Sequence, residues 1–156
     1  MKYVKNGHRN FIVIGLIFFS SVLAQAAEPN VAEVIKYRRN IMKSQREHMA
    51  VASAIVQGNV EFKDQLVDHV RALEATTRII SKLFPKDSDV GDTAALPGVW
   101  TNNAEFEARA MDTRDKSAAL SKVVSAGESQ NYEIRLSELL DSCKACHKIF
   151  RKKDEK

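Results

Sequence analysis

Residues 131–152 read NYEIRLSELLDSCKACHKIFRK, and this stretch decides the fold class. Its apolar side chains and cysteines recur at steps of four, three, four, three and four residues, which is the period of one face of an α-helix. That face carries Tyr132, Leu136, Leu139, Cys143, Cys146 and Phe150. An amphipathic helix of this kind has to bury its apolar face against other helices. The stretch therefore predicts a closing helix whose two cysteines face a core.

Three earlier segments, residues 31–57, 61–83 and 103–125, show the same helical spacing of apolar residues. A glycine or a proline follows each segment, and these residues commonly end helices. Mostly short links join the four segments. We therefore predict an all-α fold, an antiparallel up-down-up-down four-helix bundle. The exception is the 19-residue connection 84–102, and a connection of this length in a compact domain is usually disordered or functional.

The first 26 residues have a different character. A basic leader precedes a 14-residue apolar run over residues 11–24, and Ala24 and Ala26 stand at the positions that a signal peptidase reads. The run is short of the roughly 20 apolar residues that a spanning helix needs. We expect residues 1–26 to be a cleaved signal peptide and residues 27–156 to be one periplasmic domain without a stable membrane anchor. The alternative is an uncleaved anchor.

The basic composition does not indicate nucleic-acid binding. Three of the 24 lysine and arginine residues lie in the leader, so the expected mature chain has 21 basic against 20 acidic side chains. A protein that neutralises several phosphate groups needs a larger excess of positive charge. Nucleic acid is therefore not expected as a partner.

The sequence Cys143-Lys144-Ala145-Cys146-His147 is a C-x-x-C-H motif, the pattern of covalent c-type heme attachment. Residues three and four apart share a helix face, so Cys143 and Cys146 are placed to form thioethers with one porphyrin. His147 is then placed to bind the iron as the proximal ligand, as histidine commonly does in heme proteins. We therefore expect one heme c with its iron.

Three other interpretations of this motif remain open. A thioredoxin-like redox pair stands at the start of a helix in a βαβ unit, whereas this pair stands near the end of the last predicted helix. A zinc site would need a second Cys/His cluster at suitable spacing. A structural disulfide between Cys143 and Cys146 is compatible with export into an oxidising compartment.

Together these features resemble the class II c-type cytochromes, the cytochrome c prime family. The resemblance rests on CKACHKIFRKK at 143–153, VIKYRRNIM at 34–42, the helix stop at Gly58 and Pro-Gly-Val-Trp at 97–100. It implies a four-helix bundle that holds the heme between its helices. It also implies that Arg38 lies near a heme propionate and that Arg151 flanks the histidine. Otherwise each arginine is an ordinary solvated helix residue.

The residue on the distal side of the iron separates two functions. The resemblance places Met42 there, where members of the family often have leucine. Met42 stands 15 residues before Gln57, and His147 stands 16 residues after Asn131. At a rise of about 1.5 Å per residue, both lie roughly 23 Å from one end of an antiparallel bundle. We therefore predict Met42 as the distal iron ligand, with Met49 as the fallback and core packing as the alternative.

Methionine–histidine ligation is the pattern of the low-spin relatives called cytochrome c-556, and we assign the chain to that type. His48 and His69 are weaker ligand candidates. The main prediction is a one-electron carrier that meets redox partner proteins in transient encounters, and a homodimer is compatible with the family pattern. A basic cluster around the motif, from Lys144 to Lys153, is expected to dock acidic patches of those partners.

Two alternatives to the electron carrier remain. The first is a five-coordinate cytochrome c prime that binds nitric oxide or carbon monoxide. The second is a heme-free bundle that uses Cys143 and Cys146 as a dithiol or disulfide. No group of residues indicates substrate turnover, so we expect no enzymatic activity.

Overall fold

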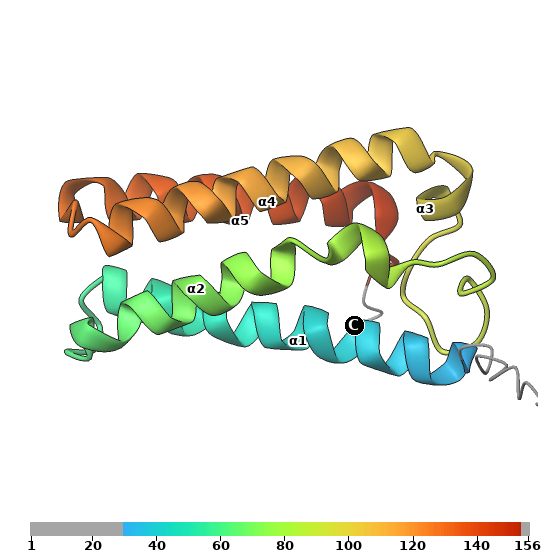
Figure 1. Cartoon of the computed structure of the whole chain (residues 1–156), viewed down its shortest axis with the longest axis horizontal. Coiled ribbons are helices and arrows are strands. Elements are labelled where there is room, and N and C mark those ends of the chain that lie inside the picture. Colours follow the sequence, from blue (N-terminus) through green and yellow to red (C-terminus); the bar gives the residue numbers. More distant parts are fainter. Residues whose placement is uncertain (1–29, 154–156) are drawn as a thin grey trace, which may run out of the picture.

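The protein was analysed as a computed structural model that describes residues 30–153, so the predicted signal peptide lies outside the described residues. The helices are α1 (Val31–Val56), α2 (Leu66–Thr77), α3 (Gly98–Thr101), α4 (Asn103–Ser125) and α5 (Tyr132–Phe150). Short 3-10 turns occupy Lys63–Gln65, Ile80–Leu83 and Ser129–Asn131. The four long helices form an antiparallel bundle, and α3 is a single turn at one end (Figure 1). The predicted four-helix bundle is confirmed. Within residues 30–153, no helix is long and apolar enough to cross a membrane.

The second helix is shorter than the predicted span 61–83, because 3-10 turns replace both of its ends. Its last turn contains Thr76, whose hydroxyl donates to the Ala72 carbonyl at 2.8 Å. Such bonds from a side chain back to the helix backbone favour bending or ending of a helix. Phe62 belongs to the apolar pattern from which the span 61–83 was predicted, but it precedes the first turn and is 58% exposed, so it lies outside the helix and the core.

Two apolar clusters make up the core. The first contains buried residues of all four long helices, among them Ala52, Val70, Leu120 and Leu139. The second lies around α3 and consists of Ile80, Val99, Phe106, Ala110 and Phe150. The closest helix pairs are α1–α2, α2–α4 and α4–α5, whereas α1 and α5 contact each other much less. The bundle is therefore open between its first and last helices.

The turn after α1 allows a first test of the fold. Gly58 ends α1 with a φ of 72°, in the left-handed region that side chains with a Cβ disfavour. No atom lies within 4 Å of a Cβ placed there, so the cost of Gly58→Ala is backbone strain alone. We expect a loss of about 1 kcal/mol in the free energy of unfolding, measured by urea titration. Gly58→Asn should lose less, because asparagine tolerates this conformation better, and equal losses would contradict the explanation.

Candidate functional site

A cavity of about 1180 Å³ lies between the two apolar clusters, with α1 on one side and α5 on the other. Leu73 and Leu139 of the first cluster and Phe106 of the second line it. Small-molecule and cofactor sites commonly have volumes of about 300–1,000 Å³, so this space is large for such a site. The weak contact between α1 and α5 thus leaves room for a large cofactor between the helices.

Cys143, Cys146 and His147 all line this cavity from α5. Cys143 packs against the first cluster and Cys146 against the second, and both thiols are free. Burial raises the pKa of the Cys143 thiol, and burial, with the neighbouring Cys143 as a smaller cause, raises the pKa of the Cys146 thiol to about 11. Both sulfurs are therefore neutral thiols at neutral pH before any covalent attachment. The helix brings the predicted attachment residues to one wall, as their spacing indicated.

Arg151 follows the motif at the end of α5. The helix ends at Phe150, two residues before the predicted limit of 152. The backbone N–H of Arg151 donates to the His147 carbonyl at 3.1 Å, and its backbone is extended. It forms an isolated antiparallel bridge with Ala95 of the long connection. Arg151 and His147 both line the cavity and both are exposed, so the cavity reaches the protein surface on this side.

Met42 lines the same cavity from α1. It is half-buried and packs against the second apolar cluster. Met49 also lines the cavity but is buried in the first cluster. His48 and His69 lie outside the cavity wall, with their Nδ1 atoms 2.9 Å apart in a contact between α1 and α2. The structure therefore brings Met42 and His147 to one cavity from facing helices, and it leaves the two weaker histidine candidates elsewhere.

Arg38 is buried, with 3% of its surface exposed, and it anchors the long connection to α1. Its Nη1 donates to the Leu83 carbonyl at 3.3 Å and to the Ser88 hydroxyl at 3.0 Å. Its Nη2 donates to the Ser88 carbonyl at 3.0 Å and to the Thr93 hydroxyl at 2.7 Å. These bonds order a connection that the sequence left as either disordered or functional. Ser88 and Thr93 were not identified from the sequence, because only the folded connection places them beside Arg38.

The surroundings of the Arg38 guanidinium are aromatic and neutral. Its Cζ atom lies 4.5 Å from the ring centroid of Phe84 and 5.7 Å from that of Trp100, within the range of cation–π contacts. Burial lowers the pKa of Arg38. Because its three bonds to the connection and its bond to the Leu83 carbonyl all go to neutral acceptors, a carboxylate in the adjoining cavity would add a favourable charge interaction. Any effect of Arg38 on a propionate would thus act mainly through charge.

Gln45 lies one helical turn after Met42 and also lines the cavity. Its Nε2 atom is buried and has no hydrogen-bond partner among residues 30–153. A buried donor without an acceptor costs about 1–3 kcal/mol, and such atoms often mark the place of a bound molecule. The sequence analysis did not identify Gln45, because a polar residue on a long helix carries no distinguishing pattern.

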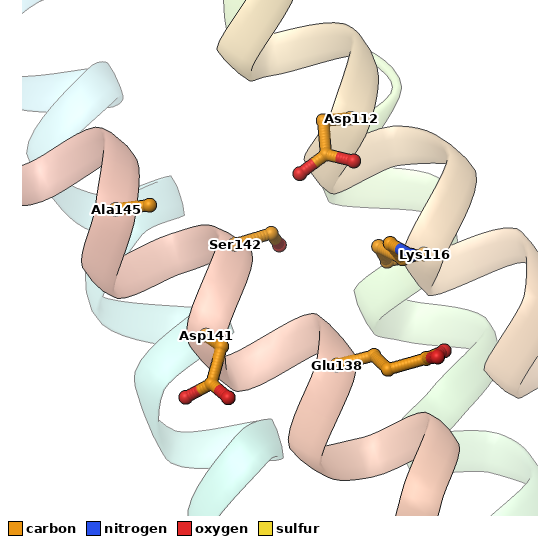
Figure 2. Close-up of a pocket in the computed structure, with 6 residues that line it drawn as sticks. All are labelled: Asp112, Lys116, Glu138, Asp141, Ser142 and Ala145. Carbon is orange, nitrogen blue, oxygen red and sulfur yellow. The ribbon is translucent and has the colours of Figure 1, made fainter.

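A second hollow, of about 420 Å³, lies between α4 and α5 and contains neither cysteine nor His147. It is lined by Asp112, Lys116, Glu138, Asp141, Ser142 and Ala145 (Figure 2). Asp141 forms an exposed ion pair with Lys144 at 3.4 Å. Within the part of the chain that the structure describes, no group of three or more His, Cys, Asp or Glu residues is placed to hold a metal ion.

The large cavity fits a covalently attached heme. Two thiols and an imidazole stand together on one wall, and apolar side chains form most of the remainder. A buried cation adjoins the cavity, and a buried amide donor lacks an acceptor. A helical bundle with this site belongs to the c-type heme proteins. Residues 33–151 match the family described as Cytochrome C', and the chain belongs to that family. Members of this family bind covalent heme c with its iron, which confirms the predicted cofactor.

Cytochrome c' of Pararhodospirillum photometricum is 30% identical to this chain over 118 residues, which are 75% of this chain and 94% of the relative. Among solved structures, cytochrome c prime from Shewanella frigidimarina has a TM-score of 0.75 at 24% identity and covers 81% of this chain and 99% of its own. A nitric oxide complex of a leucine-to-alanine mutant of cytochrome c prime from Alcaligenes xylosoxidans has a TM-score of 0.75 at 23% identity, with coverages of 81% and 99%. Both structures support the fold.

These relatives bear on two of the predictions from the sequence, the type of cytochrome and the ligation of the iron. They support the cytochrome c' family and do not support the cytochrome c-556 type to which we assigned the chain. They likewise do not support methionine–histidine ligation, and the gas-binding alternative fits them better than the methionine-ligated carrier does. The chain is thus a heme protein of a family associated with electron transfer and gas binding, whose members are generally not enzymes.

Proposed function

We propose that this protein binds nitric oxide or carbon monoxide at one covalently held heme. Cys143 and Cys146 attach the porphyrin through thioethers, and His147 binds the iron from the α5 side. The observation that carries the proposal is the cavity of about 1180 Å³, which has these three residues on one wall and α1 on the facing wall. The Alcaligenes xylosoxidans structure, a nitric oxide complex on the same fold, supports it.

The side chains that line the cavity determine which small molecules can reach its α1 side. Cys143, Cys146 and His147 would hold the heme, and its iron would supply the site that binds the gas. Ile80 and Phe106 line the cavity with apolar surface, and Met42 packs against the same cluster. This apolar part of the wall favours small uncharged molecules, because burial of an unpaired polar or charged group is costly, whereas Lys36, Lys43 and Arg46 line other parts of the same cavity. A neutral diatomic gas meets this requirement.

The proposed cellular setting follows from the leader. Removal of residues 1–26 would release residues 27–156 into the periplasm as one domain, and heme attachment there would use the two free thiols. The exposed basic residues near the motif, among them Lys148 and Lys152, would meet acidic patches of redox partner proteins in transient encounters. A homodimer remains part of the proposal. We propose no nucleic-acid partner and no enzymatic turnover.

The second candidate function is a one-electron carrier with Met42 as the distal ligand. The favouring observation is that the Met42 side chain lines the same cavity as His147, from the facing helix. A thioether on the iron would raise the reduction potential and block the site for gases. The two candidates therefore differ in one bond, the bond between the Met42 sulfur and the iron.

Met42→Leu tests this bond. For the gas-binding protein we expect a high-spin ferric heme in the wild type, rapid uptake of carbon monoxide after reduction, and little change in either property in the variant. The reason is that leucine and methionine have similar volumes, so the apolar wall keeps its shape. Optical absorption and electron paramagnetic resonance of the purified holoprotein measure the spin state.

The contrary result is equally clear. A low-spin wild type with a thioether-to-iron absorption band, converted to high spin by Met42→Leu, would replace the gas-binding proposal by the electron carrier. Met49→Leu is the matched control, because Met49 lies two turns along the same helix and also lines the cavity. It should leave the spectrum unchanged under both functions, unless Met49 is the ligand.

A further inference from the structure

We infer that the side-chain amide of Gln45 donates a hydrogen bond to the small molecule bound opposite His147. This inference rests on the proposed gas-binding function and adds a residue that determines which molecule binds. Its starting point is the Nε2 atom of Gln45, which is buried and has no hydrogen-bond partner among the described residues.

The position of Gln45 directs this donor to the cavity. Gln45 lies between Met42 and Met49 on α1, three residues after the first and four before the second, so the three share one helix face. All three line the cavity. The rise from Met42 to Gln45 is about 4.5 Å, so the amide is adjacent to the residue that faces His147.

The other buried polar groups of the cavity wall already have partners. The Thr77 hydroxyl lies 2.7 Å from the Ser117 hydroxyl, and the Thr113 hydroxyl donates to the Arg109 carbonyl at 3.1 Å. The terminal nitrogens of Arg38 donate to the Leu83 carbonyl and to Ser88 and Thr93 of the long connection. In residues 30–153, Gln45 Nε2 is the one buried side-chain nitrogen or oxygen atom without a partner. The unused hydrogen-bonding capacity of the wall therefore lies at this amide.

An acceptor in the cavity explains why an amide stands at this position. Leucine or methionine would fill a similar volume without the cost of an unpaired buried donor. A molecule with an oxygen or nitrogen acceptor, held beside Met42, removes that cost and is itself stabilised. A net hydrogen bond of about 1 kcal/mol corresponds to roughly a fivefold gain in affinity.

The test uses the reduced, heme-loaded protein with carbon monoxide as the probe. A donor beside the oxygen atom weakens the carbon–oxygen bond, so we expect Gln45→Leu to shift the carbon–oxygen stretching band to higher frequency and to lower the affinity roughly fivefold. Gln57→Leu is the matched control, because Gln57 lies exposed at the other end of α1. Infrared spectroscopy and carbon monoxide titration give the two readouts, and circular dichroism checks folding.

The measurements distinguish failure of the inference about Gln45 from failure of the proposed gas-binding function. If carbon monoxide binds but neither the stretching frequency nor the affinity responds to Gln45→Leu, the inference is wrong and the proposed function stands. If the wild type takes up no carbon monoxide, the proposed function fails. The same pair of measurements in a Met42→Leu background, where no thioether occupies the site, then decides whether Gln45 contacts the bound molecule. Gln45→Met, which keeps the side-chain length, must match Gln45→Leu.

Discussion

The double variant Cys143→Ala, Cys146→Ala is expected to lose covalent heme completely. The two thiols are free, half-buried on one wall of the cavity, and they are the only cysteines of the chain. Without them no thioether forms, and heme is held at most by His147 and apolar contacts. The measurement is the intact mass of mature protein from a host with cytochrome maturation machinery. The wild type should carry the mass of one porphyrin that resists acid–acetone extraction.

The two single cysteine variants and a control variant at the neighbouring Ser142 test whether each thiol forms a thioether. In the single variants Cys143→Ala and Cys146→Ala, a smaller fraction of molecules should carry heme through the one remaining thioether, and this heme should still resist acid–acetone extraction. Ser142→Ala is the control, because Ser142 is the buried residue next to the motif and its loss leaves both sulfurs in place, although its hydroxyl donates to the Leu139 carbonyl and also hydrogen-bonds the Cys143 thiol. A wild type without added mass, with its sulfurs free or joined to each other, would leave the heme-free bundle as the correct interpretation.

Arg38→Leu is expected to lower the free energy of unfolding of the holoprotein by about 3 kcal/mol. The variant leaves acceptors of Ser88 and Thr93 without a donor in a buried site, and it removes the contact with Phe84 and Trp100. For a domain of this size the loss corresponds to a fall of roughly 10 °C in Tm. Thermal unfolding followed by circular dichroism measures it.

Two arginine variants serve as controls for this effect. Arg39 is the next residue on α1, but it is exposed and pairs with the exposed Asp92. Arg39→Leu should cost less than about 1 kcal/mol, as is common for surface ion pairs. Arg38→Lys keeps the charge and loses the planar fork, so its loss should lie between the two. Equal losses for Arg38→Leu and Arg39→Leu would show that the buried bonds do not stabilise the connection.

Much of the candidate site was accessible from the chain alone. Cys143, Cys146 and His147 are close together in sequence, so a helix that passes through them necessarily brings them to adjacent positions. The family resemblance placed Met42 opposite them, counting residues from the two helix ends agreed with that placement, and Met42 does line the same cavity. Its bond to the iron stays a prediction, since helix counting gives the level of a side chain and not its coordination.

Gln45 and the residues that accept hydrogen bonds from Arg38 could not be identified by counting residues along the helices. Gln45 differs from the other polar residues of α1 in having a buried Nε2 atom without a hydrogen-bond partner, which depends on what packs against the helix. Ser88 and Thr93 are ordinary residues of a connection until the chain folds back onto Arg38. The second helix was overextended for a related reason, because local hydroxyl bonds and turns end α2 before its apolar period does.

The sequence by itself determined the helical class, the order of the four long segments and the place of the attachment motif. These properties depend on periodicity and on neighbours within a few residues, which are set before any tertiary contact forms. Only the tertiary structure decided that α1 and α5 stand apart around one large cavity, that Arg38 is buried under the long connection, and that Gln45 turns an unpaired donor inward. Burial and separation between helices arise from packing of residues far apart in the chain, and no local pattern contains them.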